Sequence, residues 1–363
     1  MQKHLYTCFA FLIFLAIGLL SRENRRHEQL PTATGANTVP LQRTDSFSTS
    51  TPQYEVINGT EVVWEVPSKP KFVLFVAHGC NHGAVDFWPK SEACPLCQGL
   101  PIEMNITRHA LARGYAVVAV SSAARDTHRC WNLPHMHRPD YPNDTENVKR
   151  VFDVLFPRAG LLGLPVFALG ASSGGGFVMA LGGEIPLAGI CSQIMGLPMK
   201  LMQIVLETSK RRGLKYPPTI LMHMPRDNDI ALLVQENVLA LKEHGTVVKV
   251  IQVTASPLTP SFLGEVVGSE INAPLSTLIF GEFRSSGIIG NDGMLKEDPR
   301  MTDWRAIVMN LNGTSHLRLQ PDSSPLSEIL NVLYAKHEIV SWHTMETLQI
   351  FEENEASSTS IAN

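Results

Sequence analysis

The alternation of short apolar runs with helical segments between residues 54 and 253 is the feature that most constrains the fold. The runs have the length of strands, and several lack the alternating polar face of a half-exposed strand. They lie at 71–77, 115–120, 165–169, 187–195, 218–224 and 247–253. Helical segments fall between them, at 106–113, 147–156, 200–210 and 230–244. This alternation predicts an α/β fold: a mostly parallel, twisted sheet with right-handed crossovers and helices on both faces.

Two segments depart from this alternation. Residues 54–67, YEVINGTEVVWEVP, contain two strand-like stretches around Asn58-Gly59. Because both turn residues tolerate positive φ, a β-hairpin is predicted at one edge of the sheet. Residues 255–315 contain only short helical pieces and a turn, which predicts an irregular, lid-like insertion in the C-terminal part.

The helical pattern recovers after the insertion. Ser324-Pro325 is a helix start with Glu328 at capping-box spacing, and a terminal helical stretch follows from about Trp342 to Phe351. We expect the folded domain to span 54–353, and the polar residues 354–363 to form a disordered tail.

The N-terminal segment 1–20 is strongly apolar. As a helix, the run from Leu5 to Leu20 spans about 24 Å, short of the roughly 30 Å hydrocarbon core, so it suits a signal peptide or a short anchor. A convincing cleavage site is lacking, which favours an uncleaved signal-anchor and membrane association in the secretory pathway. Residues 21–53 are polar and predict a flexible linker.

Two signals conflict over the side of the membrane on which the domain lies. Lys and Arg are more numerous after the apolar run than before it, which favours the cytoplasm. Asn-x-Ser/Thr sequons instead favour the lumen and a glycoprotein. They are at Asn58, Asn105, Asn143 and Asn312.

The chain has six cysteines. Cys80, Cys94, Cys97 and Cys130 lie in loop-like sequence, where they suit two disulfides, a four-thiolate zinc site or free thiols. Cys94-Pro-Leu-Cys97 has CxxC spacing, but no second CxxC accompanies it. We expect disulfides, and with them a lumenal or extracellular domain.

Composition narrows the classes of function. The chain of 363 residues is 44% hydrophobic and 18% charged, so it can bury a large core. Its formal charge is -4, and no long basic run indicates a nucleic-acid partner. Chemistry on a small molecule and contacts with other proteins remain.

Gly170-Ala171-Ser172-Ser173-Gly174 is a GxSxG pentapeptide between a buried strand and a helix. A sharp strand-to-helix turn exposes the serine oxygen at the carboxyl edge of the sheet, and small neighbours let the chain approach closely. The helix N-terminus favours a developing oxyanion. Ser172 is the candidate nucleophile. Ser173 is a rival, and a glycine-rich turn with capping serines is the structural alternative.

The segments AHGCNHGAVDFW, CPLC and GASSGGGF together resemble the plant esterase-like branch of the α/β-hydrolases. The resemblance covers roughly residues 54–353. It implies a Ser, Asp, His triad in that chain order, no metal or organic cofactor, and an oxyanion hole. By analogy, the backbone N–H groups of Cys80 and Ser173 would form that hole.

The acid and the base are predicted from their positions along the chain. Asp227 follows the second strand after the nucleophile strand and stands in the family's D-x-x-(V/I) pattern, with Asp229 as a rival. His337 resembles the family's closing His-Glu motif, with the terminal helical stretch behind it. His316 follows a strand-like run and a glycine turn, and it is the alternative base.

These residues predict a serine hydrolase that cleaves small-molecule esters or related acyl bonds through an acyl-enzyme. The insertion and the Met-rich segment 195–202 suit a pocket for an apolar group, although core packing explains the same residues. A non-catalytic α/β-hydrolase scaffold that serves as a ligand receptor or interaction module is the main alternative. A redox protein using Cys94 and Cys97 is a third hypothesis. It is disfavoured because this CxxC does not open a helix after a strand, as thioredoxin-type pairs do.

Overall fold

The structure is a computed structural model, and it describes residues 51–134, 143–268 and 270–362. The predicted anchor at 1–20 and almost all of the linker lie outside these residues. Within the described ranges, no helix is both long enough and apolar enough to cross a bilayer.

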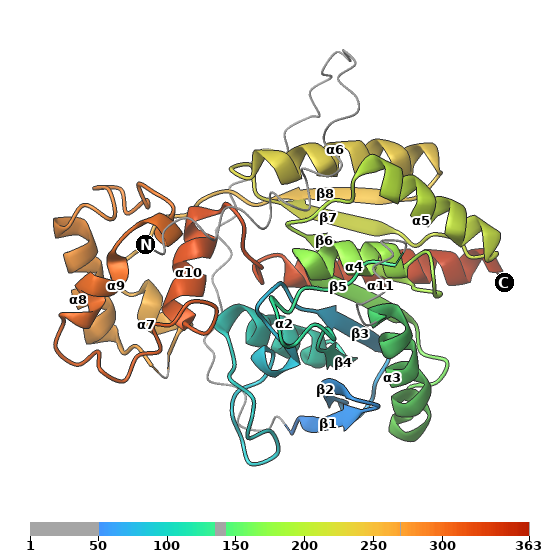
Figure 1. The fold of residues 1–363 in the computed structure, drawn as a ribbon, viewed down its shortest axis with the longest axis horizontal. Coiled ribbons are helices and arrows are strands. Elements are labelled where there is room, and N and C mark those ends of the chain that lie inside the picture. The colour runs from blue at the N-terminus through green and yellow to red at the C-terminus, as the bar shows by residue number, and fades with distance from the viewer. Residues whose placement is uncertain (1–50, 135–142, 269, 363) are drawn as a thin grey trace, which may run out of the picture. The chain divides into compact units, whose positions relative to one another are not determined.

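An eight-stranded sheet with the order β1-β2-β4-β3-β5-β6-β7-β8 forms the centre of the domain (Figure 1). The strands are β1 Gln53–Ile57, β2 Thr60–Glu65, β3 Phe72–Ala77, β4 Tyr115–Val120, β5 Val166–Ala171, β6 Gly189–Gln193, β7 Thr219–His223 and β8 Val248–Gln252. The β1–β2 hairpin is antiparallel and joins β4 antiparallel, while all the other neighbouring strands are parallel. This arrangement is the α/β-hydrolase fold, as predicted, with the hairpin at one edge.

Helices cover both faces of the sheet (Figure 1). One face carries α2 Pro101–Ala112 and α11 Thr344–Ala362. The other face carries α3 Asp144–Ala159, α4 Ser173–Leu181, α5 Met199–Arg211 and α6 Asn228–Glu243. Each face therefore has its own apolar core.

Strand β3 shows why the sequence reads as a continuous apolar run. Leu74 and Val76 pack in the core beside α2 and α11, while Val73, Phe75 and Ala77 pack in the core beside α3 to α6. Successive side chains of a strand point to opposite faces, so a strand covered on both sides needs apolar residues at every position.

The predicted insertion at 255–315 forms a helical cap beside the sheet (Figure 1). It contains α7 Phe262–Val266, α8 Ala273–Ser285, a 3-10 turn η3 Pro299–Met301 and α9 Trp304–Met309, and α10 Pro325–Tyr334 follows it. The Trp304 and Phe283 side chains are fully buried. Both side chains belong to the apolar core that α2 and α11 form with the sheet. The role of the cap as a lid stays a prediction.

Two local expectations differ from the structure. Ser324 caps α10 by accepting a hydrogen bond from Ser327 N–H at 3.1 Å. The Glu328 carboxylate instead accepts from Ile102 N–H at the start of α2, because it lies one position beyond the capping-box site. Helix α11 continues to Ala362 rather than ending before a tail at 354–363. Ser357 Oγ donates to Glu353 O within this extension.

The cysteines in loops form two disulfides, Cys80–Cys130 and Cys94–Cys97. The four thiols are consumed in these bonds, so the zinc and free-thiol alternatives do not apply. Cys191 is free and buried in β6, and burial raises the pKa of its thiol to about 12. It therefore stays protonated and unreactive.

The predicted glycosylation sites differ in accessibility. Asn58 and Asn312 are exposed. The Asn105 side chain is 2% exposed, and its amide nitrogen donates to Ser341 Oγ at 3.0 Å. A glycan needs that nitrogen, so Asn105 is not a site in the folded domain.

Candidate active site

The turn from β5 to α4 holds Ser172 in a backbone conformation that serine rarely adopts, with φ 52° and ψ -120°. Ser172 N–H donates to Gln193 O at 2.9 Å, and Gly176 N–H donates to Ser172 O at 3.1 Å. These two bonds hold the positive φ in place.

The glycines of the pentapeptide are required by close packing. A Cβ added at Gly170 would overlap the backbone of Gly174. A Cβ added at Gly174 would overlap the carbonyl oxygen of Ala77, at the end of β3. The turn is therefore pressed against the neighbouring strand, which leaves the Ser172 side chain at the carboxyl edge of the sheet.

Three predicted residues meet at this edge. His337 Nε2 lies 3.0 Å from Ser172 Oγ, and His337 Nδ1 lies 2.5 Å from Asp227 Oδ2. Asp227 caps α6 by accepting from Ile230 N–H, and its side chain is 18% exposed against 36% for His337. The loop between α10 and α11 supplies His337. The arrangement can carry a proton from the hydroxyl to the imidazole.

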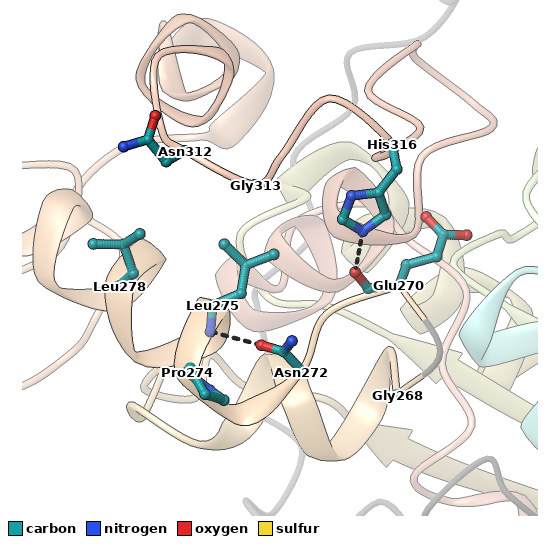
Figure 2. A pocket seen from close by; sticks show the side chains of 9 residues that line it. All are labelled: Gly268, Glu270, Asn272, Pro274, Leu275, Leu278, Asn312, Gly313 and His316. Carbon is teal, nitrogen blue, oxygen red and sulfur yellow. Dashed lines mark hydrogen bonds between the residues drawn. The ribbon is translucent and has the colours of Figure 1, made fainter.

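The rival residues lie elsewhere. Asp229 is exposed in the first turn of α6. Ser173 Oγ accepts from Trp131 N–H at 3.4 Å, while Ser172 is the serine that contacts the imidazole. His316 lines a separate pocket in the cap, where its Nε2–H donates to Glu270 O at 2.8 Å (Figure 2).

That pocket has a volume of about 370 Å³. Figure 2 shows its lining, which mixes apolar and polar side chains from α8 and the loops around it. The residues are Gly268, Glu270, Asn272, Pro274, Leu275, Leu278, Asn312, Gly313 and His316. It contains none of the residues that meet at Ser172.

The predicted oxyanion-hole amides belong to Cys80 and Ser173. A Cβ added at Gly79 would lie 3.8 Å from Ser172 Cβ, so the loop before Cys80 passes directly beside the nucleophile. Among the described residues, no group accepts a hydrogen bond from the Cys80 or Ser173 backbone N–H. Both donors are available to a ligand.

Buried hydrogen bonds of His78 hold this loop in place. Ser122 N–H donates to His78 Nε2 at 3.0 Å, so the ring proton lies on Nδ1 and is directed to Gly79 O. Burial lowers the pKa of His78 to about 3, and the ring is neutral. Trp131 Nε1–H donates to His78 O at 2.9 Å. His78 is thus a structural residue of the loop.

Two links tie the loop to the segment after β4. The Cys80–Cys130 disulfide is one, and Asn81 N–H donating to His128 O at 2.7 Å is the other. Asp144 holds the same segment by accepting from Ala123 N–H and Asn132 N–H, both at 2.7 Å. Burial raises the pKa of Asp144 to about 6, although both hydrogen bonds oppose the shift.

A partly buried ion pair follows the loop. His82 Nδ1 lies 3.1 Å from Asp86 Oδ2 in the 3-10 turn η2 Ala84–Asp86. Burial alone would lower the pKa of His82, but the hydrogen bond and charge of Asp86 outweigh it and raise the pKa to about 10. His82 is therefore a cation at neutral pH.

Sequence reasoning missed the side chains that hold the His337 loop. Arg300 donates to His337 O at 2.5 Å, and Asn331 donates to Glu338 Oε2 at 3.0 Å. The Gln193 side-chain amide donates to Val340 O and accepts from Val340 N–H. The available signal was a polar Ser192-Gln193 pair at the end of a buried strand, beside the last residues of β5.

The Met-rich segment 195–202 packs in the core on the α3–α6 face of the sheet. Met202 is fully buried in the core beside α5, and Met195 and Met199 pack against that core. These residues follow the core-packing alternative.

Comparisons with solved structures find similarity at low sequence identity. The chain is similar to a dienelactone hydrolase from Anabaena variabilis, with 18% identity and a TM-score of 0.40 over 63% of this chain and 96% of that one. It is similar to an esterase of Pyrococcus furiosus, with 13% identity and a TM-score of 0.38 over 56% and 83% of the two chains. It is also similar to an acetyl ester-xyloside bifunctional hydrolase from Caldicellulosiruptor lactoaceticus, with 16% identity and a TM-score of 0.35 over 70% of this chain and 100% of that one. No family model and no curated protein matches the chain.

Proposed function

We propose that this protein is a serine hydrolase that cleaves esters or related acyl bonds through an acyl-enzyme. One observation carries the proposal: a serine on a strained turn is within hydrogen-bonding distance of an imidazole that is itself bonded to a carboxylate. A bare serine is a weak nucleophile, and this arrangement supplies the base that it needs.

In the first half of the reaction, neutral His337 donates its Nδ1 proton in a hydrogen bond to Asp227 and presents the Nε2 lone pair to Ser172. Ser172 Oγ attacks the acyl carbonyl carbon as its proton passes to Nε2. The N–H groups of Cys80 and Ser173 bind the oxyanion. When the tetrahedral intermediate collapses, the leaving alkoxide takes the proton from Nε2 and the acyl group stays on Oγ.

The second half repeats these steps with water. His337 Nε2 takes a proton from a water molecule as its oxygen attacks the acyl-enzyme carbonyl. Collapse then breaks the bond to Ser172 Oγ, which recovers a proton from Nε2, and the carboxylic acid leaves. Asp227 stays ionised and holds the ring orientation throughout.

The substrate class and the location are parts of the same proposal. A small-molecule ester with an apolar acyl group is proposed from the apolar stretches of the insertion at 255–315, and membership of the plant esterase-like branch from the sequence resemblance. We place the domain on the lumenal or extracellular side. Two disulfides favour this location, because such bonds persist in oxidising compartments.

A fluorophosphonate probe tests the function. We expect wild-type protein to be labelled and Ser172→Ala to lose the label, while Ser173→Ala keeps it. Labelling that survives Ser172→Ala would contradict the assignment of the nucleophile. Folded wild-type protein that neither labels nor hydrolyses p-nitrophenyl esters would favour the non-catalytic scaffold.

A further inference from the structure

We infer that Gln193 is a positioning residue that holds Ser172 and His337 in register with each other. The inference rests on the proposed serine hydrolase function, and it concerns a residue whose side chain touches neither reacting group. Gln193 is the last residue of β6 and is 1% exposed.

The side chain of Gln193 binds the loop that carries the base. Its Oε1 accepts from Val340 N–H at 2.8 Å, and its Nε2–H donates to Val340 O at 2.9 Å. Val340 is 1% exposed, so neither backbone group has water as a substitute partner. The side-chain amide therefore bonds both the N–H and the C=O of buried Val340, and it fixes the position and the orientation of this backbone segment.

The main chain of Gln193 binds the turn that carries the nucleophile. Its carbonyl oxygen accepts from Ser172 N–H at 2.9 Å. Gln193 is also paired with Ala171 in the β5–β6 register, so its backbone cannot move independently of the sheet. One residue thus bonds the serine turn through its carbonyl and the histidine loop through its amide.

Other side chains bond the loop that carries His337 but do not connect it to the turn at Ser172. Arg300 donates to His337 O, Asn331 donates to Glu338, and Asn105 donates to Ser341 Oγ at 3.0 Å. Among the described residues, none of these three side chains bonds the turn at Ser172. Their contacts anchor the loop to the cap and to α2, whereas Gln193 anchors it to the nucleophile.

The expected consequence of losing the bridge is kinetic. Methionine at 193 would keep nearly the same volume but supply no donor or strong acceptor, so Val340 would shift to find partners. A misplacement of about 1 Å at the base costs on the order of 100-fold in rate. Because Gln193 is buried and apart from the substrate, binding should be unchanged.

The test compares Gln193→Met with Asn105→Leu. The control removes a buried amide that anchors the adjacent residue, Ser341, but does not reach the serine turn. For p-nitrophenyl butyrate we expect kcat of Gln193→Met to fall about 100-fold, with KM within about twofold and the fluorophosphonate labelling rate falling in parallel. For Asn105→Leu we expect kcat within about threefold of wild type.

Wild-type kcat in Gln193→Met would overturn the inference, as would an equal loss in Asn105→Leu, which would mean general loosening of the loop. If Gln193→Met does not fold, Gln193→Asn gives the same test, because its amide is one methylene too short to reach Val340. Wild-type protein that neither labels nor turns over would instead overturn the proposed function, and the role of Gln193 with it.

Discussion

Ser172 adopts a left-handed backbone conformation in a chain segment that also requires two glycines. The positive φ raises the hydroxyl above the sheet edge, and the missing Cβ atoms at Gly170 and Gly174 let the turn pack against β3. The pentapeptide could be recognised in the sequence because local packing in the turn requires small residues at these positions. Gln193 could not, because its partner Val340 is 147 positions away.

Gly174→Ala should test this steric demand. The added Cβ would meet the backbone oxygens of Ala77 and His78, so we expect the free energy of unfolding to fall by about 1–3 kcal/mol and activity to fall with it. Thermal denaturation followed by circular dichroism measures the effect.

Gly281→Ala is the matched control for Gly174→Ala. Gly281 lies in α8, and nothing lies within 4 Å of an added Cβ. Alanine there should stabilise the protein by about 0.5–1 kcal/mol. A stable Gly174→Ala variant would mean that the turn is not packed against β3 as described.

At the scale of elements, the loop after β3 is held as a unit. The Cys80–Cys130 disulfide, the Trp131 indole and the neutral His78 ring all act on the segment that presents the Cys80 N–H. The sequence predicted disulfides but left their pairing open, because pairing depends on which loops the fold brings together. Cys130 reaches Cys80 only because β3 and β4 are neighbours in the sheet.

Cys130→Ser should therefore lower kcat of ester hydrolysis. Without the bridge, the Cys80 amide loses a fixed position, and loss of one oxyanion donor costs roughly 100- to 1000-fold, which sets the upper limit. We expect a fall of about 10-fold or more in a kcat assay, and the same fall in wild type treated with dithiothreitol.

The double variant Cys94→Ser/Cys97→Ser controls for general loss of disulfides. This second bridge closes a short loop and is buried, with Cys94 fully buried and Cys97 2% exposed. We expect its kcat to stay near that of wild type. Equal losses in both variants would contradict a specific role for the Cys80–Cys130 bridge.

At the scale of the whole molecule, α10, the helix that follows the cap, is joined to α2 through a buried pair of carboxyl groups. Glu103 in α2 is 2% exposed and Glu328 in α10 is 6% exposed. Burial raises the pKa of both, and the charge of Glu103 raises that of Glu328 further. A hydrogen bond between the two side chains lowers the pKa of Glu103 and raises that of Glu328, so Glu328 is the partner that keeps its proton.

The pair makes stability depend on pH. A carboxyl group whose pKa is raised by folding stabilises the protein below its unfolded pKa, here near 4.5, and that stability is lost as pH rises through the folded pKa. The charges of His82, Asp86 and Glu338 act on the same pair, with His82 opposing the shift. We expect the free energy of unfolding in urea to decline from about pH 5 upward.

Glu328→Gln should reduce this decline and raise stability at pH 8, because its amide donates to Glu103 without a titrating proton. The exposed Glu243 at the end of α6 supplies the control, since Glu243→Gln should leave the pH profile unchanged. An unaltered decline in Glu328→Gln would exclude the carboxyl pair as its cause.

The sequence predicted the central sheet well, because strands buried on both faces leave continuous apolar runs. Asp227 and His337, now found around Ser172, were predicted from the triad order and the motifs that the family resemblance implies, combined with their positions after those strands. The cap was not predictable in detail, since α7 and α9 have only five and six residues, too few to show a helical period in the sequence. Contacts such as Arg300 with His337 and Glu328 with Ile102 join distant parts of the chain, so no local sequence pattern predicts them.

Ser172 and His337 are 165 positions apart in the chain. On the ribosome, the hydroxyl is synthesised long before the imidazole that would make it reactive. A partly made chain, or one arrested before its last helices dock, therefore carries an inert serine. Reactivity arises only once the closing segment has found its place, so an active-site probe would also count the molecules that have finished folding.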